Sequence, residues 1–317
     1  MAGAVTKAFV LAAGFGLRAR PLSLVRPKPL FPVLGRPLIS HTLENLGRAG
    51  VGEVVVNAHH LAGRLVDYLT GAHHGPVIEI LREDPILGTG GGIRNATPFL
   101  GAAPFFVVNG DIFTDLDLTA AAAEHFENGP LATLALHDHP RFNQVAVDEA
   151  GYIAGFRGRL RPGADPRSMR YMAFTGVHVV SPELIGSIPE GPGDIIPVYQ
   201  ALIEAGARVR AFFVEGAGWW EAGTFESYLN LHAGLLSRRE EGPVYMSEWA
   251  ELGDGSRING FAALGEGVVV EPGAVVEDSV LWPGARVAAG VKIKGCVLAD
   301  GATARKDAVG RPLVAGP

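Results

Sequence analysis

Lys7-Ala-Phe-Val-Leu-Ala-Ala-Gly-Phe-Gly-Leu-Arg-Ala-Arg-Pro21 is the stretch that decides the fold of this 317-residue chain. Its first part, Ala8 to Ala13, is a continuous apolar run, which is typical of a strand buried on both faces of a parallel sheet. Gly14 and Gly16 follow, and at a glycine the backbone can approach a ligand without an intervening side chain. Glycines at the carboxyl end of a parallel strand predict a polyphosphate site.

Three cations follow these glycines, namely Arg18, Arg20 and Lys28. A dinucleotide fingerprint is a competing interpretation, because Gly14 to Ala19 matches glycine, any, glycine, two of any, then glycine or alanine. Two features of that motif are missing, since no acidic residue lies about twenty positions on to bind a ribose and Pro21 interrupts the expected helix. A glycine-rich turn with solvated arginines is the remaining alternative.

The composition narrows the classes of function. A formal charge of −6 argues against a protein that binds duplex nucleic acid, which needs a basic face. The single cysteine, Cys296, excludes an internal disulfide and a cysteine cluster for zinc. No apolar stretch approaches the length of a membrane span, and the first residues lack the long apolar core of a leader peptide. We therefore expect a cytoplasmic protein that binds small molecules, without a nucleic-acid or membrane partner.

Strand-like and helix-like patterns alternate in the first 110 residues. Strands are predicted over 8–13, 51–57, 77–81 and 105–108, and helices over 37–50 and 61–69. Glu83 to Ala96 forms a second glycine-rich loop that leads into a helix. Four glycines within five residues are costly to order, so we interpret this loop as backbone that approaches a flat or charged ligand.

From residue 131 the pattern favours strands, over 132–137, 144–147, 152–156 and 173–180, which predicts an antiparallel extension of the sheet. A helix over 193–205, a strand over 209–214 and a helix over 225–237 complete this part. Residues 1–240 are therefore expected to form a Rossmann-like α/β domain. Its mixed, mostly parallel sheet would carry helices on both faces.

Residues 241–317 form a second predicted domain, in which apolar residues recur at every sixth position. The members of this series are Ala263, Val269, Val275, Leu281, Val287 and Ile293. A hexapeptide period predicts a β-helix whose periodic residues face the axis. The segment supplies about two coils at three hexapeptides per coil. So short a solenoid has open ends, so we expect it to pack on the catalytic domain or on another copy of the chain.

Several motifs together resemble those of the sugar-1-phosphate nucleotidyltransferases, also called nucleotide-sugar pyrophosphorylases. They are Leu11 to Leu22 with Arg26 to Leu30, Leu87 to Gly92, Asn109 to Asp111, Phe174 to His178, and Gly223-Thr224. They cover residues 7 to about 236, and the tail is similar to the left-handed β-helix of many members. The resemblance implies transfer of a nucleoside monophosphate from a triphosphate to a sugar 1-phosphate, with release of pyrophosphate, for envelope polysaccharide synthesis.

The resemblance also implies roles for individual residues. Arg18 would contact the leaving pyrophosphate, Lys28 the α-phosphate region, and Asp111 would bind Mg²⁺, a hard cation that takes carboxylate and phosphate oxygens. The implied nucleotide-binding residues are Leu11, Ala12, Ala13, Gly14, Gly16, Glu83, Gly88, Thr89 and Gly90. The implied sugar-phosphate contacts are Asn109, Asn143, Arg159 and Thr175.

Two positions depart from the family's pattern. The family usually supplies a second aspartate in a Trp-x-Asp-x-Gly-Thr motif, and here Glu221 takes that place. It keeps the charge but reaches one methylene further, and we expect it to be the second Mg²⁺ ligand. Many members carry Phe-x-Glu-Lys-Pro, whereas Phe156 to Leu160 reads Phe-Arg-Gly-Arg-Leu. Arg159 therefore falls on the position of the phosphate-binding lysine, and Gly158 replaces the glutamate that touches the sugar.

The identity of the triphosphate depends on Glu83. A carboxylate beside the base only accepts hydrogen bonds, and guanine offers adjacent ring and amino donors where uracil offers a single N–H. This favours GTP, with UTP next, so enzymes similar to mannose-1-phosphate guanylyltransferase or to muramate-phosphate uridylyltransferase both fit. The residues do not identify the sugar.

Two other classes of protein compete with this hypothesis. Glu221 and the missing Glu-Lys pair would suit a regulatory or sugar-nucleotide-sensing subunit that has lost turnover, although Arg18, Lys28 and Asp111 argue for an enzyme. A hexapeptide acyltransferase would need more coils and usually a catalytic histidine, and residues 239–317 contain none.

Overall fold

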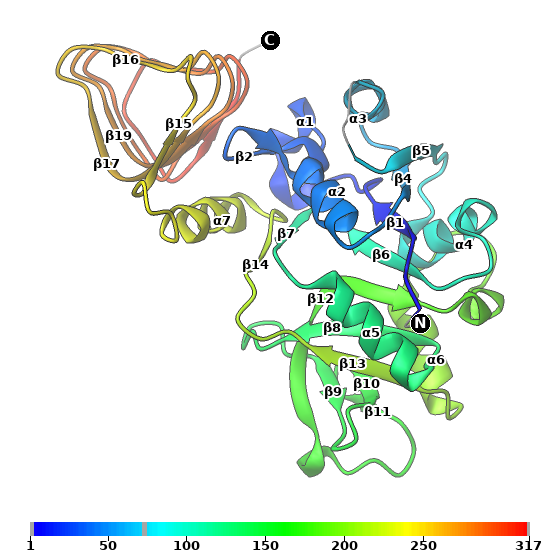
Figure 1. Cartoon of the computed structure of the whole chain (residues 1–317). Coiled ribbons are helices and arrows are strands. Elements are labelled where there is room, and N and C mark those ends of the chain that lie inside the picture. Colours follow the sequence, from blue (N-terminus) through cyan, green and yellow to red (C-terminus); the bar gives the residue numbers. More distant parts are fainter. Residues whose placement is uncertain (1–2, 72–74, 316–317) are drawn as a thin grey trace. The chain divides into compact units, whose positions relative to one another are not determined.

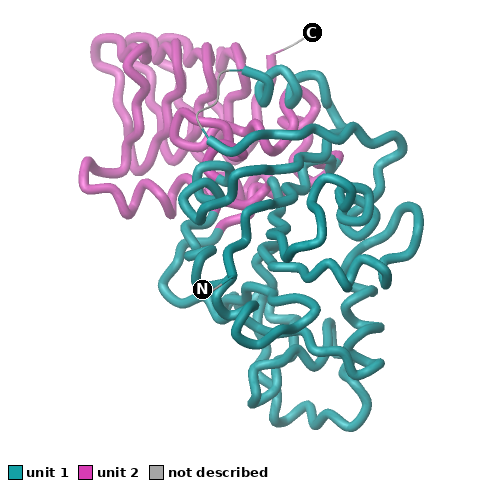
Figure 2. Tube along the Cα trace, turned by 45° about the vertical axis from the view of Figure 1, so that its right-hand side comes forward, with its two compact units in different colours: residues 1–14, 42–110, 114–219 teal, residues 15–41, 111–113, 220–317 magenta. Residues whose placement is uncertain are grey.

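The structure is a computed structural model that describes residues 3–71 and 75–315. The outer ends of the two predicted domains, residues 1–2 and 316–317, lie outside the described residues. Contacts within the chain divide it into two compact units (Figure 2). Unit 1 comprises residues 1–14, 42–110 and 114–219, and unit 2 comprises residues 15–41, 111–113 and 220–317. Residues 15–41 and 220–240 thus cluster with the C-terminal coils, and the domain boundary after residue 240 stays a prediction.

Unit 1 is built around a mixed sheet, which has ten strands among the described residues (Figure 1). Strand β1 (Lys7–Leu11) lies between β4 (Glu53–Ala58) and β6 (Phe105–Asn109), and β5 (Val77–Arg82) follows β4. These four strands are parallel. Phe9 and Val10 on β1 are fully buried, as the continuous apolar run predicts for a strand covered on both faces.

The predicted antiparallel extension is confirmed. Strand β12 (Arg170–Val180) runs antiparallel to β6, to β8 (Ala132–His137) and to β9 (Val145–Val147). The remaining strands are β10 (Ile153–Phe156), β11 (Arg159–Leu160) and β13 (Val209–Phe213), of which β13 pairs in parallel with β8.

Helices cover both faces of this sheet. Thr133 on β8 bonds to His125 of α5, whereas the next residue, Leu134, packs in the core that includes Ile93 of α4 and Val198 of α6. Because consecutive side chains of a strand point to opposite faces, α5 lies on one face and α4 and α6 on the other. The helices of unit 1 are α3 (Ala62–Leu69), α4 (Gly88–Leu100), α5 (Leu118–Asn128), α6 (Ile195–Glu204), η3 (Pro166–Ser168), η4 (Pro182–Ser187) and most of α2 (Leu38–Arg48). None of the described helices has the length and apolar character needed to cross a membrane.

The second glycine-rich segment is helical, so its prediction as a loop is wrong from Gly88 onward. The glycines form the first turn of α4, where a side chain would collide with residues 191–194. A Cβ on Gly91 would lie 2.5 Å from the Gly191 carbonyl oxygen, and one on Gly88 would lie 2.8 Å from that of Gly193. Close packing of two backbones therefore explains Gly88, Gly90 and Gly91, whereas a Cβ on Gly92 would meet the side chains of Asn57 and Glu83.

Unit 2 combines short helical turns, the longer helix α7 (Phe225–Leu236) and a series of short strands. Helix α7 begins at a capping box, in which Thr224 and Ser227 exchange side-chain and backbone hydrogen bonds. The turns and strands before the coils are η1 (Leu17–Ala19), α1 (Leu22–Val25), η2 (Lys28–Leu30), β2 (Pro32–Val33), β3 (Arg36–Pro37) and the pair β7 (Ile112–Thr114) and β14 (Trp219–Glu221), which straddles the division between units.

The predicted β-helix is present as stacked parallel strands. One series of rungs contains β16 (Glu251–Leu252), β18 (Val269–Val270), β20 (Arg286–Val287) and β23 (Thr303–Ala304). The other strands are β15 (Val244–Met246), β17 (Arg257–Leu264), β19 (Val275–Leu281), β21 (Lys292–Lys294), β22 (Val297–Leu298), β24 (Ala308–Val309) and β25 (Pro312–Leu313). Four stacked rungs make the expectation of about two coils too low, because the coils begin before Ala263 and continue past Ile293.

The period of the β-helix differs from the predicted one. Residues paired in successive coils are 18 apart at first, as for Glu251 and Val269, then 17 apart, as for Leu264 and Leu281, and 15 apart at the end, as for Val297 and Pro312. A strict six-residue series therefore identifies the axis-facing residues of one coil only, namely Leu281, Val287 and Ile293. In the preceding coil the axis-facing residues are Leu264, Val270 and Val276, each one position after the residue that the series predicts. Ala263 instead packs toward α7, while Val269 is half-buried. The coils pack on α7 and on residues 19–38, as expected for a short solenoid.

Candidate active site

The carboxyl end of β1 is held by a residue that the sequence analysis did not single out. Asn57, at the end of β4, is buried, and its Oδ1 accepts hydrogen bonds from the backbone N–H groups of Ala12 (2.6 Å) and Ala13 (3.2 Å). These two groups are therefore engaged within the protein. Gly14 is exposed, and a Cβ placed on it would meet no atom within 4 Å.

Glu83 extends this hydrogen-bond network, and we call the two buried side chains, Asn57 and Glu83, the buried relay. Its Oε1 accepts a hydrogen bond from Asn57 Nδ2 at 2.7 Å, and its Oε2 accepts one from the Leu87 N–H at 2.9 Å. Only 5% of Glu83 is exposed. Gly92 lies against both side chains, since a Cβ there would come within 3.2 Å of each. Both carboxylate oxygens thus have internal partners, so the argument that Glu83 distinguishes guanine from uracil loses its support.

Thr89 and Asp194 lie beside each other where α4 meets the start of α6. Thr89 Oγ1 accepts a hydrogen bond from the Ile195 N–H at 2.9 Å, and the N–H of Gly90 bonds to the Gly193 carbonyl at 2.8 Å. These contacts fix the first turn of α4 against the segment that precedes α6.

Asn109 and Thr175 come from the adjacent strands β6 and β12. The Asn109 side chain packs over Gly176, where a Cβ would lie 2.5 Å from Nδ2. Thr175 is 1% exposed, and its hydroxyl donates to the Ala135 carbonyl at 2.8 Å. The backbone carbonyl of Thr175 accepts from Trp219 Nε1 at 2.8 Å. The Thr175 side chain is therefore engaged in the sheet, which leaves Asn109 as the more accessible of the two predicted sugar contacts.

Asn143 closes a loop between β8 and β9. Its Oδ1 accepts a hydrogen bond from the His139 N–H at 2.9 Å, and its Nδ2 donates to Asp138 at 2.7 Å.

The His137 ring lies 4.5 Å from the Trp219 ring, and burial lowers the pKa of His137 to about 4. His137 is therefore neutral at pH 7 and packs as an aromatic side chain.

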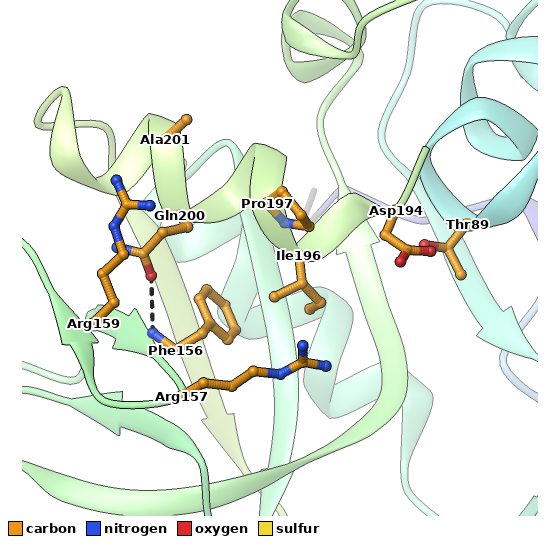
Figure 3. Close-up of a pocket in the computed structure, with 9 residues that line it drawn as sticks. All are labelled: Thr89, Phe156, Arg157, Arg159, Asp194, Ile196, Pro197, Gln200 and Ala201. Carbon is orange, nitrogen blue, oxygen red and sulfur yellow. Dashed lines mark hydrogen bonds between the residues drawn. The ribbon is translucent and has the colours of Figure 1, made fainter. Parts of the chain in front are cut away.

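Unit 1 also contains a pocket of about 510 Å³ (Figure 3). Two arginines from the β10–β11 hairpin contribute to it, together with α6 and the start of α4. Arg159 makes a double ion pair with Glu204 at 2.5 Å, whereas Arg157 has no side-chain partner among the described residues. The lining residues are Thr89, Phe156, Arg157, Arg159, Asp194, Ile196, Pro197, Gln200 and Ala201.

The charged residues of the predicted triphosphate site lie in unit 2. Lys28, on the single turn η2, forms an ion pair with Oδ2 of Asp111, and its side chain is only 12% exposed. Gly16 allows this approach, since its φ is +65° and a Cβ would lie 3.3 Å from Lys28 Cγ. The ion pair brings together two residues for which the sequence predicts separate roles, Lys28 at the α-phosphate and Asp111 as a Mg²⁺ ligand, and both roles stay predictions.

Arg18 and Glu221 approach one point over Gly223. A Cβ on Gly223 would lie 3.1 Å from Arg18 Nη2 and 3.2 Å from Glu221 Oε2, so both charged groups reach the space above this glycine. Asp111 is tied to the same segment, because its carbonyl accepts a hydrogen bond from the Ala222 N–H at 2.8 Å. Two cations and two carboxylates from three separate motifs therefore gather within unit 2.

The donor set of unit 2 fits a magnesium ion that is shared with phosphates. Both carboxylates are hard oxygen donors: Glu221 is the last residue of β14, and Asp111 directly precedes β7, the strand that pairs with β14. No cluster of three or more ligating side chains occurs in the part of the chain that the structure describes. Mg²⁺ commonly binds through one or two carboxylates plus substrate phosphates and water, so two carboxylates are sufficient.

Asn57 and Arg157 are the site residues that sequence reasoning missed. An asparagine after three valines at the end of a parallel strand was an available signal for Asn57, because a polar residue there lies at the ligand-binding edge of the sheet. Arg157 had no comparable signal, since its place in the pocket depends on the β10–β11 hairpin.

The nucleotidyl transferase family model matches residues 7–238. Mannose-1-phosphate guanylyltransferase of Mycobacterium tuberculosis is 30% identical, over 90% of this chain and 82% of its own length. N-acetylmuramate alpha-1-phosphate uridylyltransferase of Neisseria meningitidis serogroup B is 38% identical, over 58% of this chain and 79% of its own length. The crystal structure of HddC from Yersinia pseudotuberculosis complexed with GMP-PN shares the fold, with a TM-score of 0.60 and 21% identity over 72% of this chain and 98% of that one.

Proposed function

The chain belongs to the nucleotidyl transferase family, and on that premise we propose that it transfers a nucleoside monophosphate from GTP or UTP to a sugar 1-phosphate for envelope polysaccharide synthesis. Sugar-1-phosphate nucleotidyltransferase activity is the level that its relatives share. The observation that carries the proposal is the gathering of Arg18, Lys28, Asp111 and Glu221 in unit 2.

The reaction places its main demand on charge. An oxygen of the sugar 1-phosphate attacks the α-phosphorus of the triphosphate in line, the bond to the β-phosphate oxygen breaks, and pyrophosphate leaves. The second pKa of a phosphate monoester is about 6, so the nucleophile is largely dianionic at pH 7 and needs no general base. The enzyme must align two anions and neutralise the charge that moves to the leaving group.

Arg18 and Lys28 would supply this neutralisation. Lys28 is largely buried, and a cation that is shielded from water interacts more strongly with a phosphate than an exposed one does. Arg18 is exposed and has no side-chain partner among the described residues, so its planar fork is available for the pyrophosphate. We assign Lys28 to the α-phosphate and Arg18 to the leaving group.

Asp111 and Glu221 would hold Mg²⁺. When bound, the ion polarises phosphate oxygens and stabilises the charge on the leaving pyrophosphate. Glu221→Gln removes the charge of one ligand and keeps the size of the side chain. We expect the magnesium concentration for half-maximal rate to rise about tenfold or more. An unchanged magnesium requirement in this variant would reject the ligand role of Glu221.

The nucleotide would bind at the carboxyl end of β1. Residues 11–14 are the last of the first segment of unit 1, and the next residue, Phe15, begins the segment of unit 2 that carries Arg18 and Lys28. One continuous motif therefore supplies both the exposed Gly14 and the two cations. Because the Glu83 carboxylate and the Gly90 N–H are engaged internally, we propose backbone groups of residues 88 and 89 as the contacts of the base, and GTP and UTP as equal candidates.

The pocket of unit 1 is our proposal for the sugar side (Figure 3). Arg157 and Arg159 would attract the phosphate of the acceptor, and Arg159 would exchange its Glu204 partner for it. Arg157→Ala and Arg159→Ala should raise KM for the sugar phosphate with little change in KM for the triphosphate. Glu204→Gln is the matched control, because it releases Arg159 and should leave or lower that KM. Equal changes in both KM values would contradict a sugar-side role.

A panel assay tests the activity itself. The four nucleoside triphosphates are each combined with mannose, glucose, N-acetylmuramate and heptose 1-phosphates, and pyrophosphate release is measured with Mg²⁺. We expect release from GTP or UTP with one of these acceptors, and a much lower rate for Lys28→Ala with the same pair. No release from any pair would contradict the proposed function.

A further inference from the structure

The segment that carries Lys28 is anchored to the β-helix by an ion pair. Arg26 donates to both carboxylate oxygens of Asp300, with Nε–Oδ2 at 3.0 Å and Nη2–Oδ1 at 2.7 Å. The same guanidinium donates to the Leu30 carbonyl at 3.3 Å and lies 5.4 Å from the centre of the Trp282 ring. Asp300 is therefore bonded to a residue that closes the turn around Lys28.

A cluster of aromatic rings anchors the part of the segment that follows Lys28. The Phe31 ring lies 4.9 Å from Trp282 and 5.4 Å from Tyr228 of α7. Trp282 Nε1 donates to the Tyr228 hydroxyl at 3.0 Å, and that hydroxyl donates to the Pro32 carbonyl. All three rings are fully buried. A side chain of the β-helix thus supports the backbone that follows Lys28.

Lys28 itself has little local support. It lies on η2, a single turn held by backbone hydrogen bonds from Leu30 to Pro27 and from Phe31 to Lys28, each 2.9 Å. A turn of this length is not stable alone, so its position depends on what it packs against. Arg26 comes two residues before Lys28 and Phe31 three residues after it, and both contact the β-helix.

We propose that the β-helix positions the catalytic lysine, with Asp300 and Trp282 as positioning residues that act through Arg26 and Phe31. This inference rests on the role proposed above for Lys28. It gives the C-terminal coils a part in turnover in addition to any part in assembly. The physical reason is that a displacement of about 1 Å in a charged group can cost up to about a hundredfold in rate.

Asp300→Asn tests the proposal, because it removes the charge that orients Arg26 and keeps the size of the side chain. We expect kcat to fall about 10- to 100-fold. The melting temperature should fall by no more than a few degrees, because the asparagine side chain can still accept a hydrogen bond from Arg26 and both partners are partly exposed. Trp282→Phe is a second variant that keeps a ring against Phe31 and removes the hydrogen bond to Tyr228. We expect it to lower kcat several-fold.

Glu277→Gln is the matched control. Glu277 forms a 2.7 Å ion pair with Lys294 on the same β-helix and has no contact with residues 26–33 among its described interactions. It removes one negative charge, as Asp300→Asn does, so kcat should stay at the wild-type value. A fall equal to that of Asp300→Asn would show a general effect of charge and would overturn the proposal.

The Lys28→Ala background separates this inference from the proposed function. If Asp300 acts through Lys28, Asp300→Asn should have no further effect on the residual rate of Lys28→Ala. No pyrophosphate release by the wild-type chain from any substrate pair would contradict the proposed function itself, whereas normal turnover in Lys28→Ala would remove the role of Lys28 and overturn this inference. If Lys28→Ala is slow but Asp300→Asn turns over at the wild-type rate, only the positioning role is overturned. The same holds if the losses of the two single variants multiply in the double variant.

Discussion

The buried relay of unit 1 and the charged cluster of unit 2 use similar residue types in different ways. In the relay, Asn57 and both oxygens of Glu83 are bonded within the protein. In the cluster, Arg18 and Glu221 approach one point without bonding to each other, and Lys28 contacts one oxygen of Asp111. Both groups contain acidic side chains at strand ends, but only the cluster keeps charged atoms available for a substrate.

This difference separates structural from chemical roles. A buried carboxylate with two internal partners stabilises the loops that it connects, and removing it leaves their donors unsatisfied. A partly exposed carboxylate beside a cation can exchange that partner for a metal or a phosphate. Variants of the relay should therefore lower stability, and variants of the cluster should lower turnover without lowering stability.

Lys28→Ala should give the largest effect on turnover. Losing a preorganised cation that stabilises the transition state costs about 10²–10³ in kcat. The melting temperature should stay within a few degrees of the wild-type value, because Asp111 is partly exposed and can be solvated. Steady-state kinetics and a thermal scan on one preparation check both parts. Unfolding of the variant near 37 °C would mean that Lys28 belongs with the relay.

Asn57→Ala should give the largest loss of stability. It leaves the N–H groups of Ala12 and Ala13 without a partner and removes the donor to Glu83, and each unsatisfied buried group costs about 1–3 kcal/mol. We expect the free energy of unfolding in urea to fall by roughly 2–4 kcal/mol. Asn128→Ala is a suitable control, because the described hydrogen bonds of the Asn128 side chain stay within α5, from Nδ2 to Glu124. Equal stability of the two variants would refute the relay.

Acid should destabilise unit 1 through its buried histidines. Burial lowers the pKa of His178 to about 3 and that of His125 to about 4, from 6.5 in the unfolded chain. At pH values between the pKa of the folded protein and 6.5, the unfolded chain binds more protons than the native one. The free energy of unfolding therefore falls as the pH decreases below 6.5. Each fully buried histidine should lower the free energy of unfolding at pH 5 by about 2 kcal/mol relative to pH 7. Urea unfolding at pH 7, 6 and 5 measures this slope, and His178→Gln should reduce it.

Unit 2 provides the comparison for this measurement. It contains one histidine of this kind, His232, whose pKa burial lowers to about 4. If the units unfold separately, unit 1 should therefore lose stability more steeply with acid. Tryptophan fluorescence of Trp219 in unit 1 and Trp282 in unit 2, each kept as the only tryptophan, distinguishes the two transitions. Identical pH slopes for both probes would contradict the prediction.

Local patterns were sufficient to predict the sheet but not the partners of its loops. Strand β1 is recognisable because a continuous apolar run has few other uses. The glycines of α4 were misinterpreted because the backbone that they accommodate, residues 191–194, lies far away in the sequence. Glu83 was assigned to the base for the same reason, since its partner Asn57 belongs to another strand. The six-residue period indicated a β-helix, but it could not locate the register shift between Asn259 and Ala262, where the offset between paired residues changes from 18 to 17.

Gly14→Ala and Gly91→Ala give the smallest expected effects and compare the two glycine-rich stretches directly. A Cβ on Gly91 must displace the Gly191 carbonyl, whereas one on Gly14 meets no protein atom. Gly91→Ala should therefore lower the free energy of unfolding by about 1–3 kcal/mol. Gly14→Ala should preserve or slightly raise stability, by up to about 1 kcal/mol, because it restricts the unfolded chain. Its added methyl group lies where we place the nucleotide, so KM for the triphosphate should rise several-fold. If Gly14→Ala left that KM unchanged and Gly91→Ala raised it at wild-type stability, the nucleotide would bind at α4 rather than at the end of β1.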